Sequence, residues 1–273
     1  MSIVNELDYR VEGALFTSTC LKRDVILDFY LPTGVEDLSE LSLLLINDGQ
    51  DLQAMDFKTI LSDRYSGGAI GPVLCAGITA GADRKREYGV AATTDYLGRG
   101  DRAGSYTTFI INELLPFIAE KYNVKTFRDK AFAGFSLGGL SALDIVWNHP
   151  EVFSKAAVFS GSLWWRSIDQ DDPAYDDDKD RIMQQQIRNG AYAPGLKFFL
   201  QCGLLDEAQD RNNNGIIDAV DDTRDTVAEL MKKGYQPEDL FYLELDEGKH
   251  DVATWGKAMP VFLEWSWPGG NQK

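Results

Sequence analysis

The chain has 273 residues, of which 44% are hydrophobic and 11% aromatic, and its formal net charge at pH 7 is −16. Such a composition is typical of a folded globular protein and excludes an intrinsically disordered one. The negative charge argues against a nucleic-acid-binding protein, because such proteins neutralise phosphates with Lys and Arg, and against binding to anionic membrane surfaces.

The start of the chain and its cysteines bear on location. Residues 1–10, MSIVNELDYR, lack the basic region and the apolar stretch of a secretory signal peptide, and no apolar run reaches the length of a membrane span. Cys20, Cys75 and Cys202 lie far apart in strand-like segments, which favours buried thiols in a reducing compartment over a disulfide framework. We therefore expect a cytoplasmic protein.

Short apolar segments alternate with helical patterns along most of the chain. The alternating segment 25–31 predicts an antiparallel strand, and more continuously apolar segments predict buried strands at 41–47, 72–78, 131–135, 156–161, 197–202 and 240–245. Helices are predicted at 52–65, 106–122, 137–149, 222–235 and 252–265. Strands that alternate with helices indicate an α/β protein with a doubly wound sheet, here as one domain over residues 1–273.

Two long connections interrupt this rhythm, at 80–105 and at 206–222. Loops after parallel strands are where open α/β sheets bind ligands. The first loop is rich in arginines, which either bind an anionic substrate or form a solvated face; they are Arg84, Arg86, Arg99 and Arg102.

The segment KAFAGFSLGGLSALDI places Ser136 between a short apolar strand and an amphipathic helix. This is the setting of a nucleophile elbow, in which a sharp turn exposes a catalytic serine. Gly134 and Gly138 fit such a turn, because a Cβ there would collide with neighbouring backbone. The alternative is a glycine-rich corner with an idle serine.

A serine nucleophile needs a base and an acid that orients it. Of the two histidines, His149 ends a predicted helix, where it most simply neutralises the helix terminus. His250 follows the last predicted strand and is the expected base. Asp206, four residues after Cys202 near the end of a strand, is the expected acid, and Glu207 is the alternative.

Several segments together resemble a family of serine esterases that includes enterochelin esterases, esterase D, feruloyl esterases and mycolyl transferases. They are GFSLGG, HPEVFSKAAVFSGSLWW, FFLQCGLLDE and GKHDVATW, and the resemblance extends from about residue 20 onward. It implies an α/β-hydrolase fold, with a mostly parallel central sheet of about eight strands flanked by helices. It also implies a triad of Ser136, Asp206 and His250.

The resemblance further suggests where the oxyanion of the reaction is held. In INDGQDL it points to the backbone N–H of Gln50, and beside the nucleophile to that of Leu137. Gln50 could equally be an ordinary turn residue. The segment SGSLWW is most similar to enterochelin esterases, and its Trp164 and Trp165 either wall the substrate pocket or belong to the core.

These expectations describe a serine carboxylesterase that passes through an acyl-enzyme and needs no organic cofactor. Its partner would be a small-molecule ester, such as a siderophore, sugar or aryl ester. Acyl transfer to an alcohol, or a catalytically idle ligand-binding protein on the same scaffold, are the alternatives.

The loop DRNNNGIIDAVD resembles the calcium loop of EF-hands, with a glycine at its sixth position and a helix-like segment after it. The spacing predicts that this loop, an insertion within residues 206–222, binds a structural Ca²⁺. The expected ligands are Asp210, Asn212, Asn214, the carbonyl of Ile216, Asp218 and Asp221. The alternative is a solvated turn rich in Asn and Asp.

Overall fold

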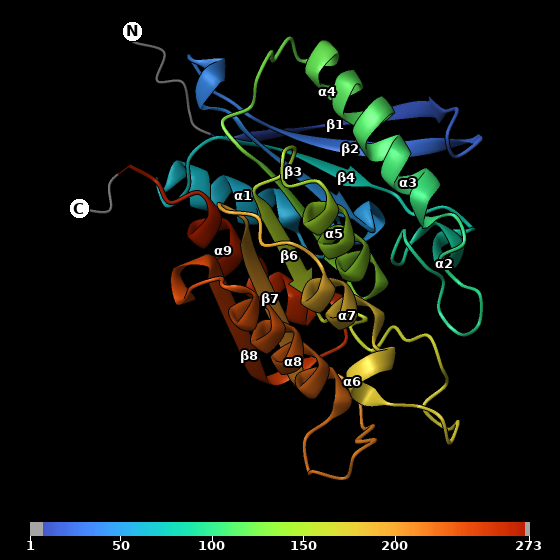
Figure 1. Cartoon of the computed structure of the whole chain (residues 1–273). Coiled ribbons are helices and arrows are strands. Elements are labelled where there is room, and N and C mark those ends of the chain that lie inside the picture. The colour runs from blue at the N-terminus through green and yellow to red at the C-terminus, as the bar shows by residue number, and fades with distance from the viewer. Residues whose placement is uncertain (1–7, 271–273) are drawn as a thin grey trace, which may run out of the picture.

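The protein is described by a computed structural model that covers residues 8–270. Eight strands form one sheet in the order β1-β2-β4-β3-β5-β6-β7-β8 (Figure 1). Their bounds are β1 Tyr9–Ser18, β2 Arg23–Pro32, β3 Ser42–Asn47, β4 Val73–Ile78, β5 Lys130–Phe135, β6 Lys155–Phe159, β7 Lys197–Leu205 and β8 Leu240–Lys249.

The sheet is mixed but mostly parallel. β2 pairs antiparallel with both β1 and β4, and every pairing from β4 through β3 to β8 is parallel. The predicted α/β-hydrolase-like sheet of about eight strands is therefore confirmed. The edge strand β1 was not predicted, because apolar side chains also lie on its exposed face and remove the alternating pattern: Val11 is 50% exposed and Leu15 is 66% exposed.

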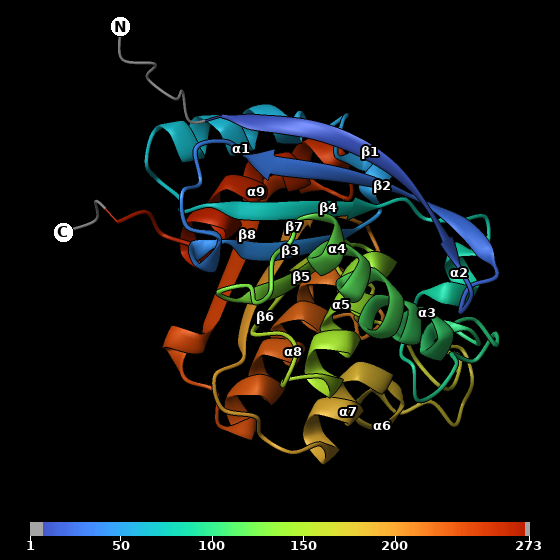
Figure 2. The same cartoon turned by 90° about the horizontal axis from the view of Figure 1, so that it is seen from above.

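Helices cover both faces of this sheet (Figure 2). Their bounds are α1 Phe57–Ser66, α2 Arg84–Glu87, α3 Ala103–Phe109, α4 Leu115–Lys121, α5 Leu137–Asn148, α6 Asp177–Asp180, α7 Ile182–Asn189, α8 Asp218–Lys233 and α9 Val252–Ser266. Short helical turns are η1 Leu38–Glu40, η2 Gly49–Asp51, η3 Ile110–Leu114, which is a π-helical turn joining α3 to α4, and η4 Pro237–Asp239. Within residues 8–270, no helix is both long and apolar enough to span a bilayer.

Two buried clusters form the core, one on each side of the sheet. Successive side chains of a strand point to opposite faces, so Leu43 and Leu45 of β3 join the cluster under α3, α4, α5, α7 and α8. Leu44 and Ile46 join the cluster under α1 and α9. All six residues of β3 are buried, as expected for a strand covered on both faces.

Some predicted helix bounds were wrong. The helix expected at 52–65 begins only at Phe57, since Asp48 and Asp56 adopt left-handed backbone conformations with φ of 59° and 56°, which separate η2 and a turn from the helix. The helix expected at 222–235 begins earlier, at Asp218. The long loop 80–105 contains the short helix α2, and α6 and α7 were not predicted.

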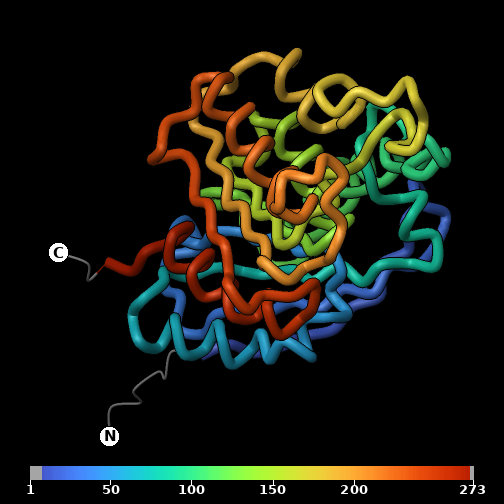
Figure 3. Tube along the Cα trace, turned by 90° about the horizontal axis from the view of Figure 1, so that it is seen from below, coloured from blue at the N-terminus to red at the C-terminus, as the bar shows by residue number. Residues whose placement is uncertain are grey.

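Parallel strands bring their carboxyl ends to one edge of the sheet. The segments that follow β3, β5, β6, β7 and β8 therefore meet there, and Figure 3 looks onto this edge. The loops after β4 and β6 lie side by side, because the N–H of Tyr96 donates to the carbonyl of Arg166 at 3.0 Å. The candidate site lies at this edge.

Candidate active site

Ser136 occupies a sharp turn between β5 and α5. Its φ of 54° and ψ of −124° are unusual for a residue with a side chain and indicate a strained backbone. The turn requires glycine on both sides, because a Cβ on Gly134 would lie 2.2 Å from the carbonyl oxygen of Gly138. The strand, turn and helix together have the arrangement of a nucleophile elbow.

Asp206 and His250 directly follow the adjacent strands β7 and β8. Asp206 Oδ2 lies 3.8 Å from His250 Nδ1, and the Asp206 side chain is 1% exposed. Neither oxygen of this carboxylate has a hydrogen-bond partner within residues 8–270. A buried acceptor of this kind is suited to a donor that approaches from His250.

The imidazole of His250 is 41% exposed and rests edge-on against Trp255, with 5.5 Å between ring centroids. Trp255 Nε1 donates a hydrogen bond to Ser160 Oγ at 3.0 Å, and the Trp255 ring stacks on Phe135. These contacts connect the orientation of the imidazole to the ends of β5 and β6.

One cavity brings the predicted nucleophile, base and acid together. It has a volume of about 310 Å³, and Ser136, Asp206 and His250 all line it. Ser160 and Ser162 also line it, and Ser162 Oγ lies 3.4 Å from Ser136 Oγ. Neither serine was predicted as a site residue, although both follow β6, the strand next to the one that precedes Ser136.

The two expected oxyanion donors come from segments that touch. Leu137 is the first residue of α5, so its N–H has no partner inside the helix. Gln50 lies in η2, immediately after Asp48 and Gly49. A Cβ on Gly138 would lie 2.5 Å from Asp48 Oδ2, which shows how closely this turn packs against the start of α5.

The turn that carries Gln50 is held by an ion pair between the buried carboxylate of Asp48 and the partly exposed Arg84. Arg84 binds both oxygens of Asp48, from Nε to Oδ1 at 2.6 Å and from Nη2 to Oδ2 at 2.7 Å. Gln50 Nε2 also donates to Asp48 Oδ1, at 3.3 Å. Arg84 thus supports the backbone that packs against the start of α5, next to Ser136.

The other loop arginines are likewise paired. Arg86 binds Asp101, Arg99 binds Asp95, and Arg102 binds Asp83. The four loop arginines therefore have carboxylate partners within the protein.

The two tryptophans of SGSLWW have different positions. Trp164 is half-buried and lines the cavity of Ser136. Trp165 is 1% exposed and belongs to the core, where a Cβ on Gly89 would lie 3.0 Å from its ring. The structure thus places only Trp164 in a position to contact a substrate there.

Glu207, the alternative acid, also lines the cavity. Burial raises the pKa of its carboxyl group; a hydrogen bond from the backbone at Ala219 opposes this rise, and the nearby Asp218 adds to it. His149 is placed differently, at the end of α5, where its Nδ1 lies 3.2 Å from Glu151 Oε1. This position suits a structural role.

The predicted calcium loop is closed by its own hydrogen bonds. Asp210 accepts the N–H groups of Asn214 and Gly215 at 3.1 and 2.9 Å, and Asp221 Oδ2 accepts Nδ2 of Asn214 at 2.6 Å and Nδ2 of Asn212 at 3.2 Å. The N–H of Ile216 donates to Asn214 Oδ1 at 2.8 Å.

Asp218 is turned to another partner, Arg211, whose backbone N–H donates to its Oδ1 at 2.9 Å. No group of three or more His, Cys, Asp and Glu side chains in residues 8–270 is placed to hold a metal ion. Calcium binding by the carboxylate, amide and carbonyl oxygens of the loop stays a prediction.

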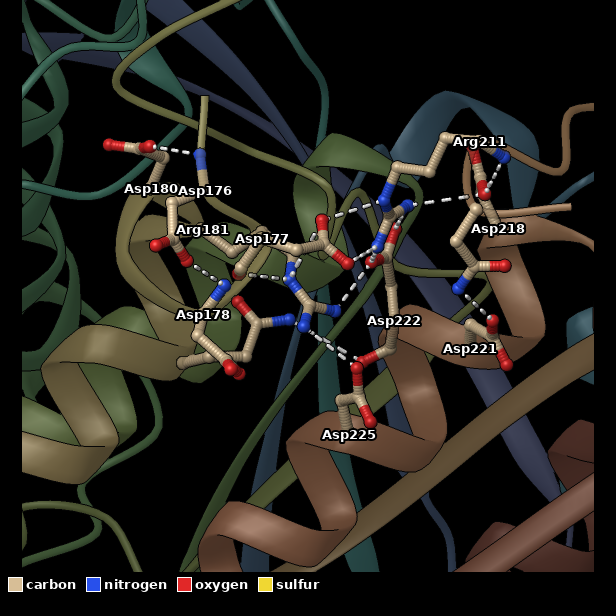
Figure 4. A network of polar contacts seen from close by, with 12 residues as sticks. Asp176, Asp177, Asp178, Asp180, Arg181, Arg211, Asp218, Asp221, Asp222 and Asp225 are labelled. Carbon is tan, nitrogen blue, oxygen red and sulfur yellow. Dashed lines mark hydrogen bonds and ion pairs between the residues drawn. The ribbon is translucent and has the colours of Figure 1, made fainter. Parts of the chain in front are cut away.

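A buried ion-pair network anchors this loop (Figure 4). Asp222, at the start of α8, accepts Arg181 Nη1 at 2.8 Å and Arg211 Nη2 at 2.5 Å. The side chains of Asp222, Arg181 and Arg211 are 1%, 4% and 7% exposed. The network therefore joins the segment before α7 to the loop that follows Asp206.

Comparisons with known proteins identify relatives of this chain in sequence and in fold. A relative from Bacillus subtilis (strain 168), the uncharacterized protein YbbA, is 33% identical over 75 residues, which are 27% of this chain and 29% of that protein. The enterobactin esterase FES from Shigella flexneri matches in structure with a TM-score of 0.66 and 20% identity, over 93% of this chain and 58% of that one. The siderophore hydrolase EstB from Aspergillus nidulans matches with a TM-score of 0.64 and 19% identity, over 95% and 96%.

The chain thus spans little more than half the length of the Shigella enzyme. The model of the family described as "Putative esterase" matches residues 18–265, which is most of the chain. The protein belongs to this esterase family.

Proposed function

We propose that the protein is a carboxylic ester hydrolase in which Ser136 is the nucleophile, His250 the base and Asp206 the orienting acid. The observation that carries this proposal is the strained turn at Ser136, with a φ of 54°, which faces the same cavity as His250 and Asp206. Membership of the esterase family supports it.

In this mechanism His250 removes the proton of Ser136 Oγ as the oxygen attacks the ester carbonyl. The carboxylate of Asp206 fixes the imidazole tautomer and stabilises the imidazolium that forms. The 3.8 Å between Asp206 Oδ2 and His250 Nδ1 must shorten when substrate binds, and catalytic hydrogen bonds in free enzymes are often long in this way.

The backbone N–H groups of Gln50 and Leu137 are proposed to hold the oxyanion of the tetrahedral intermediate. His250 then gives its proton to the leaving alcohol, and an acyl group remains on Ser136. Water, activated by His250 in the same way, releases the acid and restores the enzyme. No organic cofactor is needed in any of these steps.

The names of the structural relatives suggest substrates. Those proteins are an enterobactin esterase, a ferulic acid esterase and a siderophore hydrolase. We therefore propose a siderophore-type or aryl ester as the substrate of this chain, with sugar esters as a further class to test. The cytoplasmic location expected from the sequence stays a prediction.

The proposal is tested by kinetics with simple p-nitrophenyl esters beside feruloyl, acetyl-sugar and catecholate-lactone esters. The wild type is expected to hydrolyse at least one of them, and His250→Ala to lose nearly all of that activity. His149→Ala is the matched control and should keep it, because His149 lies at the end of α5.

Loss of activity in His149→Ala, with His250→Ala still active, would contradict the assignment of the base. If an alcohol is added and the product is its ester rather than the free acid, the activity of the protein is acyl transfer instead of hydrolysis. If the wild type cleaved none of these esters, the result would favour the alternative of a catalytically idle ligand-binding protein.

A further inference from the structure

Arg166 differs from the arginines around it, because its charge has no close partner. Its side chain is 11% exposed, and its single ion pair within residues 8–270 joins Nη2 to Asp169 Oδ1 at 4.0 Å. Its Nε is buried and makes no hydrogen bond in this part of the chain. A nearly buried guanidinium with a buried, unsatisfied Nε–H costs folding free energy, so its position calls for an explanation.

The guanidinium of Arg166 is held by aromatic rings. Its Cζ lies 5.4 Å from the ring centroid of Trp164 and 5.4 Å from that of Tyr96. Its backbone carbonyl accepts the N–H of Tyr96 at 3.0 Å. Stacking on rings fixes the plane of the guanidinium while it leaves the N–H donors at the edge available.

Arg166 lines a second cavity, with a volume of about 260 Å³. Trp164 and Glu207 line both this cavity and the cavity of Ser136, so the two are neighbours. The volume is below the roughly 300–1,000 Å³ of a site for a whole drug-sized ligand, which suits one arm of a substrate.

Among the charged residues that line this cavity, Arg166 is the cation without a close carboxylate partner, so it is available to bind an anion. Arg99 also lines it, but its Nε donates to Asp95 Oδ2 at 2.7 Å. Asp218 lines it and is bound by Arg211. Glu207 is the remaining acid, and burial raises the pKa of its carboxyl group.

We propose that this second cavity binds a carboxylate carried by the ester substrate, and that the guanidinium of Arg166 recognises it. This proposal rests on the proposed function, since it names the class of ester that the Ser136 site would cleave. A carboxylate is favoured because its two oxygens in one plane match the donors at the edge of a guanidinium.

The test compares pairs of esters in which a carboxylate replaces a carboxamide, and the uncatalysed hydrolysis of each ester is subtracted. In one series the acyl part varies: the mono-4-nitrophenyl ester of glutaric acid against 4-nitrophenyl 4-carbamoylbutanoate. In the other the leaving group varies: 4-carboxyphenyl butyrate against 4-carbamoylphenyl butyrate. In at least one series the wild type is expected to favour the carboxylate over the carboxamide in kcat/KM, and that series assigns the charged arm to the acyl or the alcohol part.

Arg166→Gln is expected to reduce this carboxylate preference by roughly 10- to 100-fold, the range for loss of a hydrogen bond to a charged group. The change should appear mainly in KM, because the arm is remote from the reacting atoms. Arg166→Lys should keep part of the preference.

The matched control is Arg128→Gln, which makes the same change in net charge. Arg128 is paired with Glu40 on the surface and precedes β5 at the end opposite Ser136, so the preference should not change. Equal kcat/KM values for carboxylate and carboxamide in both series, or a preference that Arg166→Gln leaves intact, would overturn the proposal.

A measurement without catalysis separates this proposal from the proposed function. Calorimetry compares the binding of the amides N-phenylglutaramic acid, a carboxylate, and N-phenylglutaramide, which is neutral. If the wild type binds the acid more tightly than the neutral amide, and Arg166→Gln abolishes this difference in affinity, the carboxylate site is supported even if no ester is cleaved. Ester cleavage with no such difference in either assay would leave the esterase standing and reject the carboxylate site.

Discussion

Asp206 and His250 each follow directly after one residue of a pair that lies side by side in the neighbouring parallel strands β7 and β8. Leu205 of β7 pairs with Lys249 of β8, after an irregularity in register that begins at Gly203. A Cβ on Gly203 would lie 2.3 Å from the backbone of Gly248 and 2.8 Å from Asp206 Oδ1. The close approach of these two strand ends thus places the carboxylate of Asp206 next to the imidazole.

The first prediction concerns this carboxylate. Asp206→Asn should lower kcat by up to about 10⁴, because an amide cannot stabilise the imidazolium and favours the wrong tautomer. Glu207→Gln is the neighbouring control and should cost little in kcat. Steady-state kinetics on the best ester checks both variants, and a crippled Glu207→Gln with an active Asp206→Asn would move the acid to Glu207.

The second prediction concerns the loop from Asp210 to Asp221. If it binds calcium, its two amide ligands and its short acid at the last position imply weak affinity, with Kd of about 10⁻⁵ to 10⁻³ M. Calcium at 5 mM should then raise Tm by a few degrees. Asp210→Ala should abolish the shift, and Asp171→Ala, at an exposed aspartate outside the loop, should keep it.

Activity of Asp210→Ala should fall only in part, because the loop follows Asp206 closely in the chain and Asp210 itself lines neither cavity. Calorimetry at millimolar calcium measures binding directly. Absence of heat and of a Tm shift in the wild type would leave the segment an ordinary turn.

The third prediction concerns the buried network of Figure 4. Asp222→Asn should lower the free energy of unfolding by about 3 kcal/mol, because it leaves Arg181 and Arg211 buried with less compensation. Asp225 also binds Arg181 but is 50% exposed, so Asp225→Asn should cost less than about 1 kcal/mol. Urea unfolding compares the two, and equal losses would show that burial of the network adds no stability.

The fourth prediction concerns pH. The hydrogen bonds from Arg188 lower the pKa of Glu229 from 4.5 to about 2. A lowered pKa means that the ionised carboxylate stabilises the fold above pH 4.5, and that this contribution is lost as the pH falls towards 2. Glu229→Gln should therefore reduce the free energy of unfolding by about 1–2 kcal/mol at pH 7, a range that allows for solvent around Arg188.

The difference between Glu229→Gln and the wild type should shrink in urea unfolding at pH 4 and again at pH 3. Glu40→Gln serves as the control, since the ion pair of Glu40 with Arg128 is exposed on both sides. A difference that stays constant from pH 7 to pH 3 would contradict the role of the carboxylate charge.

The strands and the sharp turn at Ser136 could be predicted because their signals are local. Apolar runs give β3 to β8, and small residues around Ser136 mark the turn before α5. The amphipathic pattern of α7 is short and carries three glutamines in sequence, so the helix escaped prediction although Ile182, Met183 and Ile187 are buried.

The polar partners could not be predicted, because they join distant parts of the chain. Arg84 binds Asp48, which lies 36 residues away, and no local pattern distinguishes this paired arginine from Arg166, which lacks a close partner. Ser162 was missed for a related reason: its contact with Ser136 depends on the pairing of β5 with β6.

The central claim, that Ser136 is the activated nucleophile, is tested most directly by covalent labelling with a fluorophosphonate. We expect the intact mass of the wild type to rise by one adduct, which peptide mapping places on Ser136. Ser136→Ala should fold with an unchanged Tm, take no label and lose on the order of 10⁶ in kcat. A label on another residue, or a Ser136→Ala variant that keeps a tenth of the wild-type turnover, would contradict the account.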